Sequence, residues 1–184
     1  FMHKTIVLVG FMGCGKTHLG QYAAKALGME FADTDSLIER EAGMSISQIF
    51  AEQGEAAFRK WETEVLRRSC QERGKILATG GGVVKNQQNV ELLHAMDVSV
   101  VWLVADAGRI YGRLRQDNTR PLLADTSGEA KRRRIETLLA EREELYKRAA
   151  QYAFIEEGFS EEQMGDAFVQ WLEREIFEKD GKKS

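Results

Sequence analysis

The sequence predicts an α/β fold in which a parallel β-sheet is covered by helices on both faces. Short apolar, β-branched segments alternate along the chain with longer amphipathic segments, which is the pattern of strands joined by helical crossovers. The clearest strand candidates are apolar on both sides, as expected for strands buried between two helical layers. A glycine-rich loop also joins the first of these strands to the first helix.

Five segments carry a strand pattern of differing strength. Thr5–Val9 and 99–104 are the strongest, because they consist mainly of β-branched and other apolar residues. The segments 29–32 and 75–79 are shorter but similar, and the pair Phe154-Ile155 is the weakest.

Amphipathic segments between the strands predict helices, several with clear end signals. Segment 17–27 has apolar residues along one side and is followed by Gly28, a residue type that commonly ends helices. Ser45 and Ser160 each have a glutamine three residues later, which is a capping box at a helix start. Two longer helices follow from apolar residues at helical spacing, at 55–73 and 128–150.

The overall composition fits a soluble globular protein. We expect one domain spanning 1–184, because 184 residues are enough to enclose one core. Acidic and basic residues are interleaved with a net charge of −3, which argues against nucleic acid or an anionic membrane as a partner. No apolar run is long enough to span a bilayer, and no signal-peptide pattern precedes the first strand. We therefore expect a cytoplasmic, monomeric protein with Cys14 and Cys70 reduced.

One polar segment, 113–126, fits neither a helix nor a strand pattern. It contains the only proline, Pro121, and shows no clear periodicity. Loops of this length inside compact domains are usually binding loops or lids and less often disordered tethers. The sequence therefore predicts a lid.

The segment 10–17 reads G-x-x-x-x-G-K-T between a predicted strand and a predicted helix. That setting is typical of a phosphate-binding loop, in which glycines let backbone N–H groups surround an anion at a helix N-terminus. Lys16 is predicted to reach the β- and γ-phosphates, and Thr17 to offer its hydroxyl to Mg²⁺. The loop predicts nucleotide binding but leaves the reaction open.

A second magnesium ligand has two candidates at strand ends. Asp106 follows the most apolar segment, although it also stands where a helix is expected to begin and could serve only as its N-cap. Asp33 and Asp35 follow a shorter strand and would lie on the same side of an extended segment. Two such acids suit a kinase, although an aspartate-rich turn often bonds only its own backbone. The residues themselves leave this choice open.

Several separated motifs together resemble the shikimate kinase family along nearly the whole chain. Besides the loop 10–17 they are Asp33-Thr-Asp35, Gly54-Glu-Ala-Ala-Phe-Arg59 with Glu62, Thr79-Gly-Gly-Gly82, and Arg120-Pro-Leu-Leu123 within the predicted lid. The resemblance implies a P-loop kinase fold, a three-layer sandwich with a five-stranded parallel sheet in the order 2-3-1-4-5. It also implies transfer of the ATP γ-phosphoryl group to the 3-hydroxyl of shikimate, which serves aromatic amino acid biosynthesis.

The resemblance further implies roles for individual residues. Lys16, Asp35 and Arg120 would be catalytic, with an acceptor-binding region at about 33–62 and a mobile lid at about 113–127. Mg²⁺ would be bound by Thr17 directly and by Asp33 through water. The nucleotide would contact Gly13, Cys14, Gly15, Lys16, Thr17, His18, Arg113 (near the adenine) and Arg120. Shikimate would contact Asp35, Arg59, Gly80, Gly81, Gly82 and Arg142.

Physical reasoning agrees with the acceptor part of this assignment. Arginine pairs with a carboxylate in bidentate fashion and stays charged when desolvated, which suits Arg59 and Arg142. Bare glycine backbone after an apolar strand lies where α/β folds bind ligands. Arg142 interrupts an apolar helical stripe, an expensive position without an anionic partner. An internal ion pair is the alternative for Arg142, and pairing with Glu55 or Glu62 is the alternative for Arg59.

Departures from the family pattern and rival functions remain. His18 follows the loop where serine or threonine is usual, Gln151 replaces a common aspartate, and the adenine side near 156–158 is the least typical part. Gluconate kinases and nucleoside-monophosphate kinases share the phosphate loop but do not explain the other motifs. The sequence Asp125-Thr-Ser-Gly128 reads D-x-x-G, as in a GTPase switch, but it follows no strand and no guanine-recognition motif N-K-x-D occurs.

Overall fold

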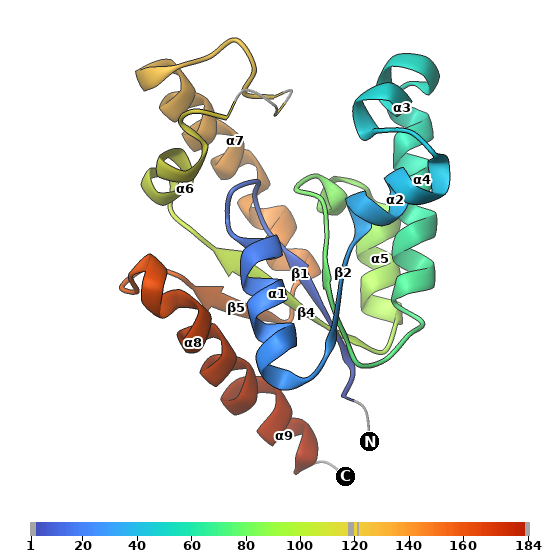
Figure 1. The fold of residues 1–184 in the computed structure, drawn as a ribbon, viewed down its shortest axis with the longest axis vertical. Coiled ribbons are helices and arrows are strands. Elements are labelled where there is room, and N and C mark those ends of the chain that lie inside the picture. Colours follow the sequence, from blue (N-terminus) through green and yellow to red (C-terminus); the bar gives the residue numbers. More distant parts are fainter. Residues whose placement is uncertain (1–2, 118–119, 121, 183–184) are drawn as a thin grey trace.

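The chain folds around one parallel β-sheet in the computed structural model, which describes residues 3–117, 120 and 122–182. The strand order is β2-β3-β1-β4-β5, and every neighbouring pair is parallel (Figure 1). This confirms the fold class and the strand order. The strands are β1 (Thr5–Val9), β2 (Glu30–Asp33), β3 (Lys75–Ala78), β4 (Val98–Val104) and β5 (Tyr152–Ile155).

Helices cover both faces of the sheet. On one face α1 (Lys16–Leu27) packs beside α8 (Glu161–Leu172), and on the other α5 (Gln87–Ala95) packs beside α7 (Gly128–Ala149) (Figure 1). The other helical elements are α2 (Thr34–Ala42), α3 (Ile46–Gln53), α4 (Glu55–Ser69), η1 (Val83–Lys85), α6 (Ala107–Leu114), η2 (Glu173–Phe177) and α9 (Glu178–Gly181).

The central strand explains where the site lies. All five residues of β1 are buried, and β1 is flanked by β3 and β4. Burial of these apolar side chains on both faces contributes on the order of 25 cal/mol per Å² of apolar surface removed from water. Because the strands are parallel, their carboxyl ends meet at one edge of the sheet. The loops that follow β1, β2 and β3 therefore lie side by side there.

The predicted helix ends agree with the structure in most places. Ser45 and Ser160 both form complete capping boxes. Gly28 ends α1 with a φ of 68°, a left-handed conformation that glycine adopts without steric strain. Asp106 caps α6, and its Oδ1 atom accepts a hydrogen bond from the backbone N–H of Arg109 at 2.8 Å.

Two segments differ from their predicted structure. Asp33 and Asp35 do not share an extended segment, because the Asp33 carboxylate accepts bonds from the N–H groups of Asp35 and Ser36 and starts α2 directly after β2. Arg113 lies in the last turn of α6 rather than in a loop. The helix expected to begin at Asp106 is present as α6, but it buries only Ile110 and Leu114, too few apolar positions to show from the sequence that it extends past Arg113.

A smaller second core lies apart from the main one. It consists of Ile38, Ile49, Phe58 and Val65, contributed by α2, α3 and α4. These three helices project together beyond the sheet (Figure 1). They hold the segment 33–62 as a packed unit with its own apolar contacts.

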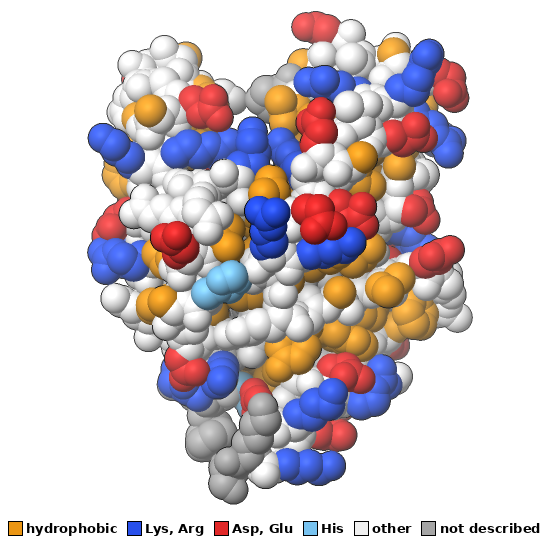
Figure 2. Space-filling view, turned by 180° about the vertical axis from the view of Figure 1, so that it is seen from behind, with side chains coloured by type: hydrophobic (Ala, Val, Ile, Leu, Met, Phe, Trp, Pro, Cys, Tyr) orange, Lys and Arg blue, Asp and Glu red, His pale blue; other side chains and the backbone are white. Residues whose placement is uncertain are grey.

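The surface carries charges of both signs. Figure 2 shows lysine and arginine side chains interspersed with aspartate and glutamate over one face, in agreement with the balanced composition. Among the described residues, no helix is both long enough and apolar enough to cross a bilayer.

Candidate active site

An open cavity of about 410 Å³ lies at the carboxyl ends of the central strands. The phosphate loop forms its middle. Asp33, Asp35 and Gly80 line one end, whereas Arg113 and Glu161 line the other. The cavity is lined by Met12, Gly13, Gly15, Lys16, Thr17, His18, Leu19, Asp33, Asp35, Thr79, Gly80, Gly81, Arg113, Arg120, Glu161 and Met164.

The phosphate loop has backbone conformations that require glycine. Gly13 has a φ of 78°, and a Cβ atom there would lie 2.9 Å from Leu114 Cγ. A Cβ atom at Gly10 would lie 2.6 Å from the sulfur of Cys14, which is buried beneath the loop. The Lys16 ammonium is also buried, and it donates to the carbonyls of Gly10 at 2.5 Å and Phe11 at 3.1 Å. A positive charge is thus held inside a ring of backbone groups.

Thr17 and Asp33 form a pair of hard oxygen donors beside this lysine. The Thr17 hydroxyl donates to Asp33 Oδ2 at 3.2 Å, while Asp33 Oδ1 caps α2. Mg²⁺ prefers a small number of such protein oxygens and fills its octahedral shell with water and phosphate. The donor chemistry at this point of the cavity therefore fits Mg²⁺.

The rival positions lie elsewhere. Asp106 caps α6 and does not line the 410 Å³ cavity. The D-x-x-G sequence that begins at Asp125 lies at the start of α7, and neither Asp125 nor Gly128 lines that cavity. The structure thus places Asp33, rather than either rival, beside Thr17.

Each residue of the triple glycine lies against a different functional side chain. A Cβ atom at Gly80 would lie 3.2 Å from Asp35 Oδ1, and one at Gly82 would lie 3.1 Å from Arg59 Nη2. At Gly81 it would lie 3.7 Å from Arg142 Nη1. The loop after β3 is therefore the surface on which the acceptor-side residues converge.

Asp35 is largely removed from water at this end of the cavity. Its Oδ1 atom is buried and has no hydrogen-bond partner within the described parts of the chain. Burial raises the pKa of Asp35 to about 6, and the negative charge of Asp33 acts in the same direction. Asp35 lines the cavity, and a carboxylate there can accept a hydrogen bond from a ligand hydroxyl.

Arg59 is held by a buried carboxylate one turn further along α4. Its Nη1 atom donates to Glu62 Oε1 at 3.0 Å, and Glu62 is 1% exposed. Burial raises the pKa of the Glu62 carboxyl, and the charge of Arg59 opposes that shift. Glu55 contacts Arg59 from the outside at 3.4 Å. Both alternatives considered for Arg59 are therefore present in the structure.

Within the described structure, Arg142 does not form the internal ion pair that was considered as the alternative to binding an anionic ligand. Instead its guanidinium lies over the ring of Phe11, 5.6 Å from the centroid, and its Nη1 donates to the carbonyl of Gly81 at 3.4 Å. Tyr146, one turn later on α7 and fully buried, donates to the same carbonyl at 2.8 Å. These contacts with Phe11 and Gly81 leave Arg142 without a carboxylate partner among the described residues.

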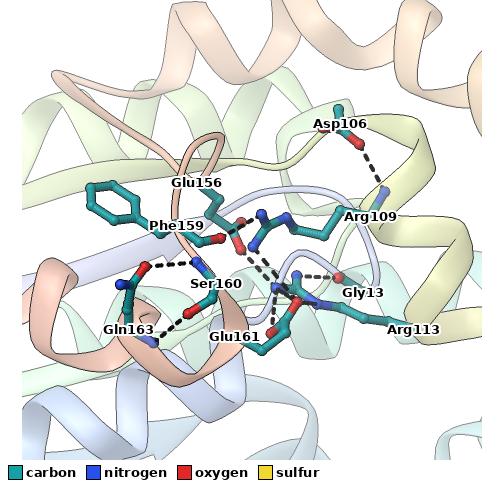
Figure 3. A network of polar contacts seen from close by, with 9 residues as sticks. All are labelled: Gly13, Asp106, Arg109, Arg113, Glu156, Phe159, Ser160, Glu161 and Gln163. Carbon is teal, nitrogen blue, oxygen red and sulfur yellow. Dashed lines mark hydrogen bonds and ion pairs between the residues drawn. The ribbon is translucent and has the colours of Figure 1, made fainter.

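Arg113 and Arg120 both line the cavity. Arg113 contacts the phosphate loop, β5 and α8 in one polar network (Figure 3). Arg120 pairs with Asp117 at 3.5 Å and lines the cavity. In the first turn of α7, the fully buried ammonium of Lys131 donates to the carbonyl of Leu114 at 2.9 Å and to that of Asp117 at 2.8 Å.

The structure thus gathers most of the residues predicted for the site, with some exceptions. Arg59, Gly82 and Arg142 lie behind the glycine loop and do not line the 410 Å³ cavity, and the Cys14 side chain points away from it. Of four further residues in these contacts, Glu62 was considered from the sequence as a partner of Arg59 and Glu156 only as part of the adenine-side segment 156–158, whereas Tyr146 and Glu161 were not assigned. Glu62 and Tyr146 had a local signal, since they stand three and four residues after Arg59 and Arg142.

Comparisons with known proteins give one consistent family. A family model described as shikimate kinase matches residues 12–173. A shikimate kinase of Thermodesulfovibrio yellowstonii is 39% identical over 171 residues, which cover 93% of this chain and 96% of that protein. One of Caldicellulosiruptor bescii is 48% identical over 120 residues, covering 65% of this chain and 69% of that protein.

Solved structures agree with the sequence relatives. A shikimate kinase from Acinetobacter baumannii, solved in complex with shikimate, superposes with a TM-score of 0.83 at 34% identity over 96% of this chain and 95% of that chain. One from Bacteroides thetaiotaomicron gives 0.86 at 29% identity, over 96% and 99% of the two chains. A gluconokinase from Sinorhizobium meliloti gives only 0.59 at 12% identity, a likeness of fold alone.

Proposed function

The chain belongs to the shikimate kinase family and is an ATP-dependent kinase acting on shikimate, and we propose how its residues divide that reaction. One observation carries the proposal. A single cavity contains a phosphate loop in its middle, a pair of hard oxygen donors beside it, and a buried carboxylate at one end. ATP and shikimate can therefore bind next to each other in the same cavity.

The phosphate loop binds the ATP phosphates, and Lys16 contacts the β- and γ-phosphates. Its ammonium already lies among the loop carbonyls, within the ring of groups that would surround an anion. Thr17 and Asp33 would hold Mg²⁺ beside the phosphate loop. The ion neutralises charge on the transferred phosphoryl group when it is bound.

The acceptor end binds shikimate through its carboxylate and its hydroxyls. Arg59 and Arg142 approach consecutive glycines of the loop after β3, so they can pair with one carboxylate. The bare backbone of Gly80 and Gly81 lets the cyclohexene ring approach closely. Asp35 accepts a hydrogen bond from the 3-hydroxyl and fixes its direction.

In the transfer step the oxygen of the 3-hydroxyl attacks the γ-phosphorus, and the bond to the bridging oxygen of ADP breaks. The hydroxyl proton passes to the Asp35 carboxylate, and the products are 3-phosphoshikimate and ADP. A loose transition state places little demand on the strength of the base. Positioning of the two substrates and charge stabilisation by Lys16 and Arg120 then supply most of the catalysis.

The segment that follows α6, at about 115–127, acts as a lid over the cavity. Arg120 lies inside it and lines the cavity, and Lys131 anchors its first residues to α7. Replacing Arg120 with alanine should therefore lower turnover by about 10²- to 10³-fold and leave shikimate binding nearly unchanged. Turnover equal to that of the unmodified enzyme would remove Arg120 from the mechanism.

The acceptor is tested by measuring ADP release with shikimate, gluconate, AMP and CMP at matched concentrations. We expect shikimate alone to stimulate ADP release, and chelation with EDTA to abolish it until Mg²⁺ is added back. Activity with gluconate or a nucleotide only would overturn the proposal. We further propose that the enzyme is cytoplasmic and acts as a monomer. Size-exclusion chromatography of the same preparation tests the monomeric state.

A further inference from the structure

We propose that Glu156 is a positioning residue for the nucleotide end of the site. In this role its buried carboxylate holds the guanidinium of Arg113 against the phosphate loop. Arg113 would thereby form a fixed wall for the base of ATP. The inference rests on the proposed nucleotide role of Arg113 and adds the residue that makes that role possible.

Arg113 connects three separate elements, as Figure 3 shows. Its Nη1 atom donates to the carbonyl of Gly13 in the phosphate loop at 2.8 Å. Its Nη2 atom contacts Glu156 Oε1 at 2.9 Å and Glu161 Oε1 at 3.0 Å. All of the rotational freedom of a long arginine side chain is removed by these contacts, since the fork is held from three directions.

Burial decides which of the two glutamates fixes the arginine. The side chain of Glu156 is 0% exposed, whereas that of Glu161 is 63% exposed. Exposed ion pairs are screened by water and add little, while a buried carboxylate depends strongly on its partner. Glu161 is therefore an outer contact, and Glu156 provides the rigid anchor.

The backbone around Glu156 is rigid as well. Its N–H donates to the carbonyl of Val104 at 2.9 Å and so extends the pairing of β5 with β4 by one residue. Arg109, one turn before Arg113 on α6, donates to the carbonyl of Phe159 at 2.7 Å (Figure 3). The turn that follows β5 is thus attached to α6 at two points. A carboxylate on this frame has little freedom to move.

The cavity has one end left for the nucleoside. The phosphate loop occupies its middle, and Asp35 with Gly80 marks the acceptor end. The opposite end is lined by Arg113, His18 and Met164. A planar guanidinium stacks well on an aromatic base, but only if its plane does not rotate away, and the contact with Glu156 prevents that rotation.

Glu156 also has a feature that packing alone does not explain. Its second oxygen, Oε2, is buried and has no hydrogen-bond partner within the described part of the chain. A carboxylate left half-satisfied in the interior destabilises a fold unless something else requires it. An apolar residue of similar size would fill the space without that penalty. The ion pair with Arg113 accounts for the presence of a carboxylate at position 156.

The test is a double-mutant cycle made of Arg113→Met, Glu156→Gln and the combined variant. We expect Arg113→Met to raise KM for ATP about tenfold and Glu156→Gln about fivefold. KM for shikimate should not change, and kcat should stay within about twofold. The combined variant should match Arg113→Met alone, because a residue that acts only through Arg113 has no effect once Arg113 is gone.

Each outcome of the cycle has a distinct meaning. A Glu156→Gln enzyme with unchanged KM for ATP, in a series where Arg113→Met raises it, would refute the positioning role alone. The same conclusion follows if Glu156→Gln raises KM equally with and without Arg113. If Arg113→Met leaves KM for ATP unchanged, the proposed nucleotide role of Arg113 fails first.

Two further variants guard against loss of folding and of charge. Glu157→Gln removes a charge from the next residue, which is exposed, and is expected to leave KM for ATP unchanged. Arg113→Lys keeps the positive charge but cannot reach three partners at once, so it should also raise KM for ATP several-fold if Glu156→Gln proves unstable. A lysine variant with unchanged KM contradicts the proposal.

Discussion

The two ends of the cavity are built on the same arrangement of charges. At the acceptor end Arg59 contacts Glu62 at 3.0 Å, and at the nucleotide end Arg113 contacts Glu156 at 2.9 Å. The arginine side chains are 26% and 22% exposed, whereas the glutamates are 1% and 0% exposed. In both pairs the second carboxylate oxygen is buried without a hydrogen-bond partner among the described residues. In each pair a partly exposed arginine is thus held by a buried acid.

An outer glutamate completes each arrangement. Glu55 contacts Arg59 and is 62% exposed, and Glu161 contacts Arg113 and is 63% exposed. Water screens these outer contacts, so the buried acids determine the orientation of the two arginines.

The two pairs differ in how far apart their residues are along the chain. Arg59 and Glu62 are three residues apart on α4, so a single helix sets their geometry. Arg113 and Glu156 are 43 residues apart and come from α6 and the end of β5. A local pair forms whenever its helix forms, whereas a distant pair forms only when the whole sheet is in place. The nucleotide end therefore depends more on the completed fold.

The largest effect is expected for a change of Asp35, the acid at the acceptor end that forms no ion pair with an arginine in the described structure. Asp35→Asn should lower turnover by about 10³-fold, because the amide cannot take the hydroxyl proton. Binding of both substrates should change little. Steady-state kinetics with shikimate varied at saturating ATP measures this. A variant that retains a tenth of the turnover would show that Asp35 only orients the hydroxyl.

The same substitution should stabilise the protein at alkaline pH. Burial raises the pKa of Asp35 to about 6 in the folded state, so the ionised form is disfavoured there. The stability linked to this raised pKa is present at low pH and is lost as the pH rises through about 6. Without nucleotide or metal, Asp35→Asn should therefore raise Tm by several degrees at pH 8 and by much less at pH 4. Equal shifts at both values would contradict the assignment.

The next largest effect is expected for Arg59→Met, which should affect the use of shikimate but not of ATP. We expect kcat/KM for shikimate to fall about 10²- to 10³-fold, because a desolvated ion pair with the substrate carboxylate is lost. KM for ATP should stay within about twofold, the opposite of the result expected for Arg113→Met. Measuring both constants in both variants sharpens the comparison. If kcat/KM for shikimate and KM for ATP change together in both variants, the proposed distinction between the acceptor and nucleotide ends is wrong.

Glu62→Gln tests whether the local pair behaves like the distant one. The glutamine keeps the shape but loses the charge that holds Arg59, and we expect kcat/KM for shikimate to fall about 30-fold. Thermal unfolding should show a smaller loss than for Glu156→Gln, because helix α4 still keeps residues 59 and 62 adjacent. A larger loss of Tm in Glu62→Gln would reverse the distinction between local and distant pairs.

The smallest effects are expected from the outer glutamates. Glu55→Gln and Glu161→Gln should change the corresponding KM by about twofold at low salt, and by less at 0.5 M salt. Kinetics at the two salt concentrations measures this. An effect of Glu161→Gln as large as that of Glu156→Gln would show that burial does not rank the two acids.

The sequence predicted the parts of the site that are contiguous along the chain. The phosphate loop, the capping boxes at Ser45 and Ser160 and the triple glycine each depend on neighbouring residues, and they have the expected structure. The strand order followed from the family resemblance. A helix was expected to begin at Asp106, but its last turn with Arg113 was taken as loop because the helix buries few residues. The extended interpretation of Asp33 to Asp35 overlooked the side-chain cap that starts α2.

The parts that could not be predicted depend on contacts between distant segments. The resemblance put Arg113 and the segment 156–158 both on the adenine side, but no local pattern indicates that the Glu156 carboxylate meets Arg113, since the partners come from different crossovers of the sheet. The convergence of Tyr146 and Arg142 on the carbonyl of Gly81 is similar. Their spacing on α7 indicates a shared face, but the receiving carbonyl belongs to the loop after β3.

Lys131 has a consequence for how the length of the lid can vary. Its ammonium joins the end of α6 to the beginning of α7 and closes a loop without a covalent bond. Once both ends of a flexible loop are fixed, doubling its length adds only about 0.6 kcal/mol of closure entropy. Residues can therefore be gained or lost between Arg120 and the carbonyls that Lys131 contacts, with little effect on the rest of the fold. The reach of that arginine can be adjusted by insertion and deletion while the sheet and its buried acids stay unchanged.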